Sequence, residues 1–281
     1  MLVVVCGMHR SGSTLVAQLV RGLLEAQSKP VTISTNGLGD TVEQMRERAA
    51  DPDRIWLAKV HQQARRFREG LPDDGAVYFY TYRDMRDALA SAWRKNRLQI
   101  GDPERSAKAL QDFIRTQIKA AKAFEPRHHL WMGKYEEFVH DLEGLTHQLA
   151  AALQIQPSPT LVATLIAAAR PDEQRKRVQQ LMEGDRTVRA STFITSNHIT
   201  DGREGAWKDT LTVAEAQLAE NLARTWLKAK GYALCFRRDP GATVAPLRYG
   251  KRRQPDNRNA EPKQPPQRQP RRRWWPFAGR C

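Results

Sequence analysis

Cysteine is scarce in this sequence, with three among 281 residues, at positions 6, 235 and 281. Cysteines this few and this far apart form neither a disulfide framework nor the paired ligands of a zinc site. Several histidines also lack partners at metal-ligand spacing: His128, His129, His140, His147 and His198. We therefore expect a protein of the reducing cytoplasm that uses no metal.

Long apolar runs are absent as well. No stretch approaches the roughly 20 apolar residues that a membrane-spanning helix needs. The apolar run at Leu2 to Cys6 is too short for a signal peptide and follows no basic segment. With 40% hydrophobic residues, the chain can bury the core of one large α/β domain.

Acidic residues are outnumbered, with 31 Asp and Glu against 46 Lys and Arg, for a net charge of +15. Residues 248–281 hold eleven basic and two acidic side chains, a net of +9, which leaves +6 for the preceding 247 residues. The same end of the chain is rich in proline, glutamine and asparagine, a composition that does not fold. We predict a folded domain over residues 1–237 and a basic, Pro-rich disordered tail over residues 238–281.

The tail places aromatic residues beside arginines in the run from Arg271 to Phe277. This pattern suits an anionic membrane interface or stacking on single-stranded nucleic acid. Two interpretations stay open: a solubilising extension without a partner, and recruitment to an anionic membrane at the inner surface of the cell. Nucleic acid is the less favoured partner.

The first fifteen residues predict a phosphate-binding element. Leu2 to Cys6 is continuously apolar, as in a strand buried on both faces of a parallel sheet, and apolar residues at helical spacing begin at Leu15. Gly7 and Gly12 between them permit a sharp turn. A loop in this position aims backbone N–H groups and the helix dipole at an anion.

This loop lacks the lysine that would indicate a nucleoside triphosphate as its ligand. The spacing Gly7-x-x-x-x-Gly12 is that of a Walker A loop, but Ser13 stands where nucleotide triphosphatases have lysine. Binding of a β,γ-phosphate pair with magnesium is therefore disfavoured. The cation comes from Arg10, whose planar fork suits one terminal phosphate or sulfate.

Apolar strands alternate with amphipathic helices along the rest of the chain. This order predicts a P-loop NTPase-like, three-layer α/β/α fold with a central, mainly parallel sheet. Further strands are expected at residues 31–33, 55–61, 76–82 and 129–132, and helices at 40–50, 85–97, 103–124, 135–153, 157–184 with a break at Pro171, and 212–230. Lys59 and His61, two residues apart on a strand, share a face at the sheet edge where such folds bind ligands.

Five landmarks in order resemble the sulfotransferases that use 3′-phosphoadenosine 5′-phosphosulfate (PAPS). They span roughly residues 1 to 235, and the order makes the resemblance far more specific than any one of them. The landmarks are the loop Gly7 to Leu15, Lys59-Val60-His61, the segment Tyr82 to Ser91, Lys134 to Val139, and the late loop Gly202 to Lys208.

The resemblance implies a role for each candidate residue. The 5′-phosphate is held by the loop residues Arg10, Ser11, Gly12, Ser13 and Thr14. Arg10, assisted by Lys59, neutralises the charge that develops as the sulfuryl group leaves, and His61 is the general base that takes a proton from the acceptor. Arg83 and Ser91 hold the 3′-phosphate, Tyr135 contacts the cofactor, and Arg203 with Lys208 closes over it. The family's adenine-stacking aromatic is replaced by Leu15.

The function expected from these residues is metal-independent transfer of a sulfuryl group from PAPS to a hydroxyl or amine of a small-molecule, glycan or lipid acceptor. One alternative is a P-loop kinase of small molecules, disfavoured by Ser13 at the lysine position. Another is a non-catalytic protein that binds nucleic acid or a membrane surface through its tail. The sequence indicates neither the acceptor's identity nor an oligomeric state.

Overall fold

The computed structural model describes residues 1–34, 42–60, 70–94, 103–184, 193–194 and 202–237. The strands are β1 (Leu2–Gly7), β2 (Val31–Ser34), β3 (Ile55–Lys59), β4 (Ala76–Tyr82) and β5 (Leu130–Lys134). The helices are α1 (Ser13–Glu25), α2 (Val42–Ala50), α4 (Met85–Arg94), α5 (Pro103–Phe124), α6 (Tyr135–Phe138), α7 (Leu142–Ala152), α8 (Pro159–Ala169), α9 (Pro171–Met182), α11 (Trp207–Thr210) and α12 (Val213–Ala229).

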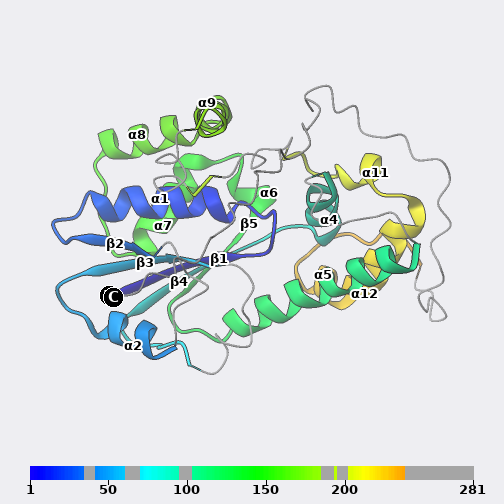
Figure 1. The fold of residues 1–281 in the computed structure, drawn as a ribbon, viewed down its shortest axis with the longest axis horizontal. Coiled ribbons are helices and arrows are strands. Elements are labelled where there is room, and N and C mark those ends of the chain that lie inside the picture. Colours follow the sequence, from blue (N-terminus) through cyan, green and yellow to red (C-terminus); the bar gives the residue numbers. More distant parts are fainter. Residues whose placement is uncertain (35–41, 61–69, 95–102, 185–192, 195–201, 238–281) are drawn as a thin grey trace, which may run out of the picture. The chain divides into compact units, whose positions relative to one another are not determined.

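The five strands form one parallel sheet in the order β2-β3-β1-β4-β5 (Figure 1). The first strand is central, with Val4 opposite Ala58 on β3 and Tyr78 on β4. Every residue of β1 is buried, which is why its sequence is apolar without alternation. Because the strands run the same way, the carboxyl ends of β1, β3 and β4 meet at one edge of the sheet.

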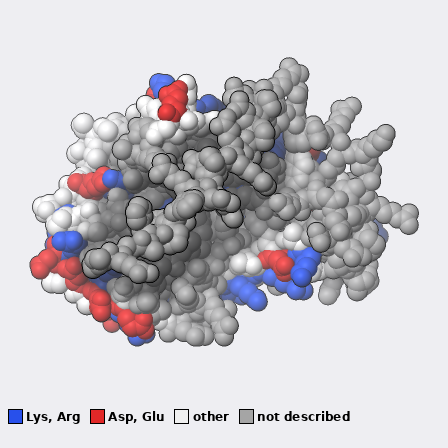
Figure 2. All heavy atoms as spheres, viewed as in Figure 1, with Lys and Arg blue, Asp and Glu red and all other residues white. Residues whose placement is uncertain are grey.

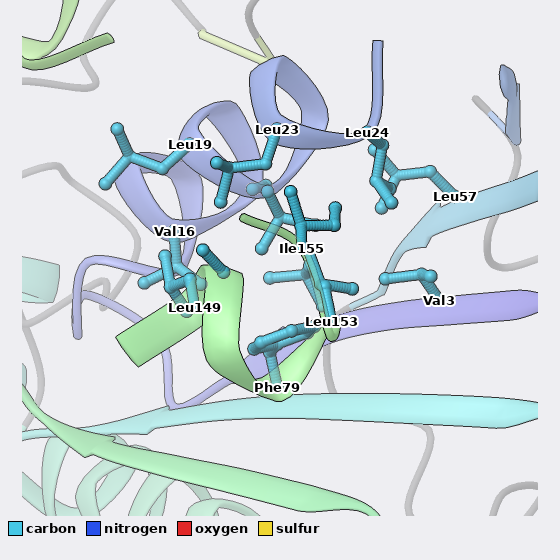
Figure 3. Packing of buried hydrophobic residues seen from close by; sticks show 14 of the residues in the cluster. Val3, Val16, Leu19, Leu23, Leu24, Leu57, Phe79, Leu149, Leu153 and Ile155 are labelled. Atoms are coloured by element: carbon cyan, nitrogen blue, oxygen red, sulfur yellow. The ribbon is translucent and has the colours of Figure 1, made fainter. Parts of the chain in front are cut away.

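Helices cover both faces of the sheet. On one face, α1 and α7 pack over β1, β3 and β4, and Figure 3 shows Leu19 and Leu23 of α1 together with Leu149 of α7 in this core. On the other face, Phe124 of α5 contacts Tyr80 of β4, with 5.3 Å between the ring centroids. The prediction of a three-layer α/β/α fold is thereby confirmed.

Two sequence expectations for helices were wrong. The single helix expected over residues 135–153 is two helices, α6 and α7, because Asp141 caps a new start by accepting the Gly144 N–H at 2.8 Å. The short helix α11 lies in a stretch expected to be a loop. The break expected at Pro171 is confirmed, since α9 begins there, where proline needs no N–H partner.

Side chains of both charges lie on the surface of the described residues. Figure 2 shows acidic and basic side chains side by side on one face. Every residue that the structure describes belongs to one compact unit. The predicted disordered tail at 238–281 lies outside the described residues, so its boundary and disorder remain predictions.

Across the described helices, none combines the length and apolar character needed to cross a bilayer.

Candidate functional site

The first loop, Gly7 to Thr14, joins the carboxyl end of β1 to α1. Arg10 and Gly12 both have left-handed backbone conformations, with φ of 67° and 82°. Gly12 is the N-cap of α1; no side chain caps the helix, and its first turn contains no acidic residue. The first N–H groups of α1, at Ser13 and Thr14, therefore have no intrahelical acceptor and are arranged to bind an anion.

Ser11 turns its hydroxyl inward. Its Oγ lies 2.7 Å from the Met8 carbonyl oxygen, and 3.0 Å and 2.6 Å from the carbonyl oxygen and Oγ1 of Thr81 on β4. Gly7 is required in the same place, because a Cβ there would lie 2.1 Å from Thr81 Oγ1. The Ser11 side chain thus anchors the loop to the sheet. Its predicted binding of the 5′-phosphate stays a prediction, and the backbone N–H of Ser11 is the donor that would make this contact.

Arg10 and Ser91 lie together although 81 residues separate them. Arg10 Nε donates a hydrogen bond to Ser91 Oγ at 2.9 Å. The sequence assigned Arg10 to the 5′ end of the cofactor and Ser91 to its 3′-phosphate. Their contact means that the first loop and α4 face the same space.

The first loop has a second support that the sequence did not reveal. The His9 N–H donates to Oε1 of Gln117 on α5 at 2.9 Å, and His9 Nδ1 lies 3.3 Å from Gln117 Nε2. Because Oε1 is already an acceptor, the amide nitrogen faces the ring and Nδ1 must accept. The available signal was a glutamine on the buried face of an amphipathic helix, beside Ile114 and Ala120.

Arg83 is deeply buried, with 3% of its surface exposed. Its Nη2 donates to the carbonyl oxygens of Gly202 at 2.9 Å and Arg203 at 2.7 Å. The guanidinium carbon lies 4.4 Å from the centre of the Tyr135 ring, a cation–π contact. Arg83 Nε is buried and has no hydrogen-bond partner among the residues that the structure describes. This donor faces the Glu136 carboxylate, with Nε 3.9 Å from Oε1, so the buried guanidinium is charge-paired on this side.

Asp87 holds the other polar groups of the late loop, Gly202 to Lys208. Its carboxylate accepts the Gly205 N–H at 2.8 Å and the Trp207 N–H at 2.9 Å, and it lies 3.9 Å from Arg83 Nη2. Burial raises the pKa of Asp87, an effect that Arg83 and the two N–H groups oppose. Arg83, between β4 and α4, binds carbonyl oxygens of the late loop, and Asp87 on α4 binds its N–H groups, so the two side chains together hold the loop.

The Tyr135 ring lies between the two loops. A Cβ on Gly12 would stand 2.9 Å from Tyr135 Cδ2, and a Cβ on Gly202 would stand 2.6 Å from its hydroxyl oxygen. The ring is also edge-on to Phe138, with centroids 5.6 Å apart. Tyr135 therefore contacts both predicted cofactor loops and Arg83.

The remaining candidates lie at the margin. Arg203 pairs with Asp209 at 2.7 Å, both side chains being more than half exposed, and Lys208 is exposed. Lys59, at the end of β3, is half-buried with Nζ 6.0 Å from the centre of the Phe193 ring. His61 lies outside the described residues. Among the residues that are described, no group of three or more His, Cys, Asp or Glu is arranged to hold a metal.

Among the solved structures that share this fold, three illustrate the likeness. Retinol dehydratase in complex with androsterone and the inactive cofactor PAP is 16% identical with a TM-score of 0.54, over 84% of this chain and 82% of that one. Its complex with retinol and PAP gives 18% identity and a TM-score of 0.54, over 84% and 83%. Mouse sulfotransferase SULT7A1 complexed with PAP is 14% identical with a TM-score of 0.58, over 81% and 84%.

At these identities, the likeness to solved structures shows the fold alone. No curated protein matches the chain. A family model described as the sulfotransferase domain matches residues 2–231, which is most of the chain and nearly all of the described part. The resemblance inferred from the five landmarks is thereby confirmed: the chain belongs to the sulfotransferase domain family.

Proposed function

We propose that this protein transfers a sulfuryl group from PAPS to a hydroxyl or amine of a small-molecule acceptor. The observation that carries the proposal is the hydrogen bond between Arg10 and Ser91. It joins a helix N-terminus prepared for one anion to the α4 segment predicted to hold another. A single ligand with anionic groups at its 5′ and 3′ positions fits this pair of elements, and the three structural neighbours are named as complexes with PAP.

The 5′ end of the ligand would be held by the first loop. The N–H groups at the start of α1, from Gly12 to Thr14, and the hydroxyls of Ser13 and Thr14 supply donors. PAPS supplies the activated sulfuryl group, whose departure leaves negative charge on the bridging oxygen. Arg10 lies in this loop and can neutralise that charge with assistance from Lys59, so the scheme needs no metal.

The 3′ end would be held by Arg83 and Ser91. The support for an anion at this point is the buried positive charge of Arg83, of which 3% is exposed. Tyr135 would line the site beneath Arg83. Arg203 and Lys208 are exposed on the late loop, where they can turn toward a bound phosphate.

The acceptor would lose its proton to His61, the general base of the proposal. Androsterone and retinol, named in two of the neighbouring complexes, are apolar alcohols, and they support a small-molecule alcohol as the acceptor. Glycan or lipid acceptors are the alternatives that an acceptor screen would separate.

The test offers the purified protein two labelled donors, PAPS carrying ³⁵S and ATP carrying a γ-³²P phosphate with magnesium, together with a panel of alcohols and amines. Label should pass from PAPS without added metal and in the presence of EDTA. His61→Ala should abolish transfer while PAP still binds. Transfer from ATP would establish a kinase instead, and normal turnover by His61→Ala would remove His61 as the base.

We also propose that the tail recruits this enzyme to an anionic membrane at the inner surface of the cell. The support is the run from Arg271 to Phe277, in which three arginines precede aromatic residues. The full chain should sediment with vesicles that contain phosphatidylglycerol and not with pure phosphatidylcholine. Equal sedimentation of a chain truncated after Leu247 would show that the tail has no such role.

A further inference from the structure

We infer that Tyr232 is a positioning residue for the 3′-phosphate end of the site. Tyr232 follows α12, far along the chain from the loops assigned above, and it acts on Arg83 through Glu136. The inference rests on the proposed function, because it concerns how Arg83 is held for the ligand.

Glu136 is a buried carboxylate whose two oxygens have different partners. Oε2 accepts a hydrogen bond from the Tyr232 hydroxyl at 2.9 Å, and Oε1 accepts the Asp84 N–H at 3.0 Å. Oε1 also lies 3.9 Å from Arg83 Nε, the buried donor without a hydrogen-bond partner in the described structure. Tyr232 and Asp84 together fix the carboxylate plane, and the carboxylate faces the edge of the guanidinium.

The hydroxyl of Tyr232 also favours the charged form of Glu136. Burial raises the pKa of Glu136, and the hydrogen bonds from Asp84 and Tyr232, together with the Arg83 charge, oppose that rise. Loss of the hydroxyl leaves one carboxylate oxygen without its donor. The negative charge that orients Arg83 then becomes harder to maintain.

The segment that carries Tyr232 is itself anchored. The Ala233 carbonyl oxygen accepts from Arg86 Nη2 at 2.9 Å, and the N–H groups of Cys235 and Phe236 donate to the Glu220 carboxylate, each at 2.8 Å. Glu220 is fully buried. The phenol is therefore presented to Glu136 by a fixed backbone, which is what a positioning residue requires.

Tyr82 provides a matched control. Both tyrosine rings lie 6.0 Å from the Trp226 ring, and each faces a lysine ammonium, with Lys134 Nζ 5.0 Å from the Tyr232 ring and Lys230 Nζ 5.2 Å from the Tyr82 ring. The Tyr232 hydroxyl contacts Glu136, whereas the Tyr82 hydroxyl takes no part in that contact. The Tyr232 ring stacks on Trp226 and the Tyr82 ring meets it edge-on, with interplanar angles of 20° and 89°, and replacing each tyrosine with phenylalanine removes one hydroxyl near the same tryptophan.

The experiment measures the Kd of PAP and of adenosine 5′-phosphate, which lacks the 3′-phosphate, by calorimetry. Tyr232→Phe should weaken PAP binding about tenfold, as expected for loss of one hydrogen bond to a charged group, and leave adenosine 5′-phosphate unchanged. Tyr82→Phe should change neither. Glu136→Gln, in which an amide nitrogen replaces one acceptor oxygen, should show the same selective loss as Tyr232→Phe and should add little to it in the double variant.

The outcomes separate the inference from the function on which it rests. If the unaltered protein binds PAP no better than adenosine 5′-phosphate, the proposed 3′-phosphate site is wrong. If it discriminates but Tyr232→Phe and Glu136→Gln weaken both ligands equally, or neither, Tyr232 has no positioning role. Thermal unfolding of each variant confirms that the titrated protein is folded. If Tyr232→Phe does not fold, the binding data for Glu136→Gln test whether the contact between Tyr232 and Glu136 affects binding of the 3′-phosphate.

Discussion

The two loops that face the candidate site are built in different ways. The first loop, Gly7 to Thr14, is shaped by its own neighbours: a buried strand before it, left-handed backbone at Arg10 and Gly12, and a helix after it. The late loop, Gly202 to Lys208, is held from outside by two side chains, Arg83 just before α4 and Asp87 on α4. The conformation of the first loop is determined by residues next to it in the sequence. The conformation of the late loop depends on partners far away in the sequence.

The largest effect should come from removing the contacts of Asp87 with the late loop. Asp87→Ala leaves two N–H groups without their acceptor and removes the carboxylate beside buried Arg83. We expect a loss of roughly 3–5 kcal/mol in the free energy of unfolding, typical of breaking a buried charged contact, measured by guanidinium chloride denaturation. Asp87→Asn keeps one acceptor oxygen and should lose less. Equal stability of Asp87→Ala and the unaltered protein would contradict the conclusion that Asp87 holds the late loop.

A glycine pair compares the loops directly. Gly12 and Gly205 both have positive φ, of 82° and 72°. A Cβ on Gly12 would stand 2.9 Å from Tyr135, whereas a Cβ on Gly205 would lie 4.0 Å from Cε of Lys208. Gly205→Ala should cost about 1–2 kcal/mol for its left-handed backbone. Gly12→Ala should cost more and should also weaken PAP binding by about tenfold, equivalent to about 1.4 kcal/mol, since it displaces the Tyr135 ring. If Gly12→Ala and Gly205→Ala changed the affinity for PAP and the free energy of unfolding equally, the Tyr135 ring would move aside without an energetic cost.

Within the first loop, the hydroxyl of Ser11 should matter for stability. Ser11→Ala leaves the fully buried Thr81 hydroxyl without this partner and should cost about 1–2 kcal/mol. Thr81→Ser, which keeps the hydroxyl, is the matched control and should preserve more of the loop's stability than Thr81→Val. If Ser11→Ala weakens PAP binding with no change in unfolding, the hydroxyl serves the ligand and not the sheet.

The smallest expected effect is a pH dependence near the late loop. Burial raises the pKa of Asp87 and Glu136 above their ordinary values of 3.8 and 4.5. The folded protein therefore binds these protons more readily than the unfolded chain, so their contribution to stability falls as pH rises above those values. The stability of the unaltered protein relative to Glu136→Gln should decline between pH 4 and pH 7 in denaturant titrations. A relative stability that rises over this range would have the wrong sign.

Local patterns in the sequence predicted most of the fold. The buried run of β1, the apolar stripe of α1 and the proline at the start of α9 depend on neighbours within a few residues, and each was found. Beyond such patterns the sequence was weaker. Asp141 starts a new helix within a pattern that continues to look helical, so α6 and α7 were read as one.

The site was predicted as a set of residues and not as an arrangement. Arg83, Ser91 and Tyr135 came from the order of the landmarks, and the structure brings them near the first loop. The sequence could not show that Asp87 accepts N–H groups 118 and 120 residues away, because no local pattern links positions that far apart. Gln117 and Tyr232 were missed for the same reason, since each finds its partner through the fold.

The position of Tyr135 has a consequence for engineering. Its side chain lies within 3 Å of the Cβ positions of glycines in both loops, with the ring facing Gly12 and the hydroxyl facing Gly202, so a side chain at either glycine would displace Tyr135. A loop transplanted from a relative would have to arrive with a compatible ring and a compatible opposite loop. The three segments would therefore have to be exchanged together.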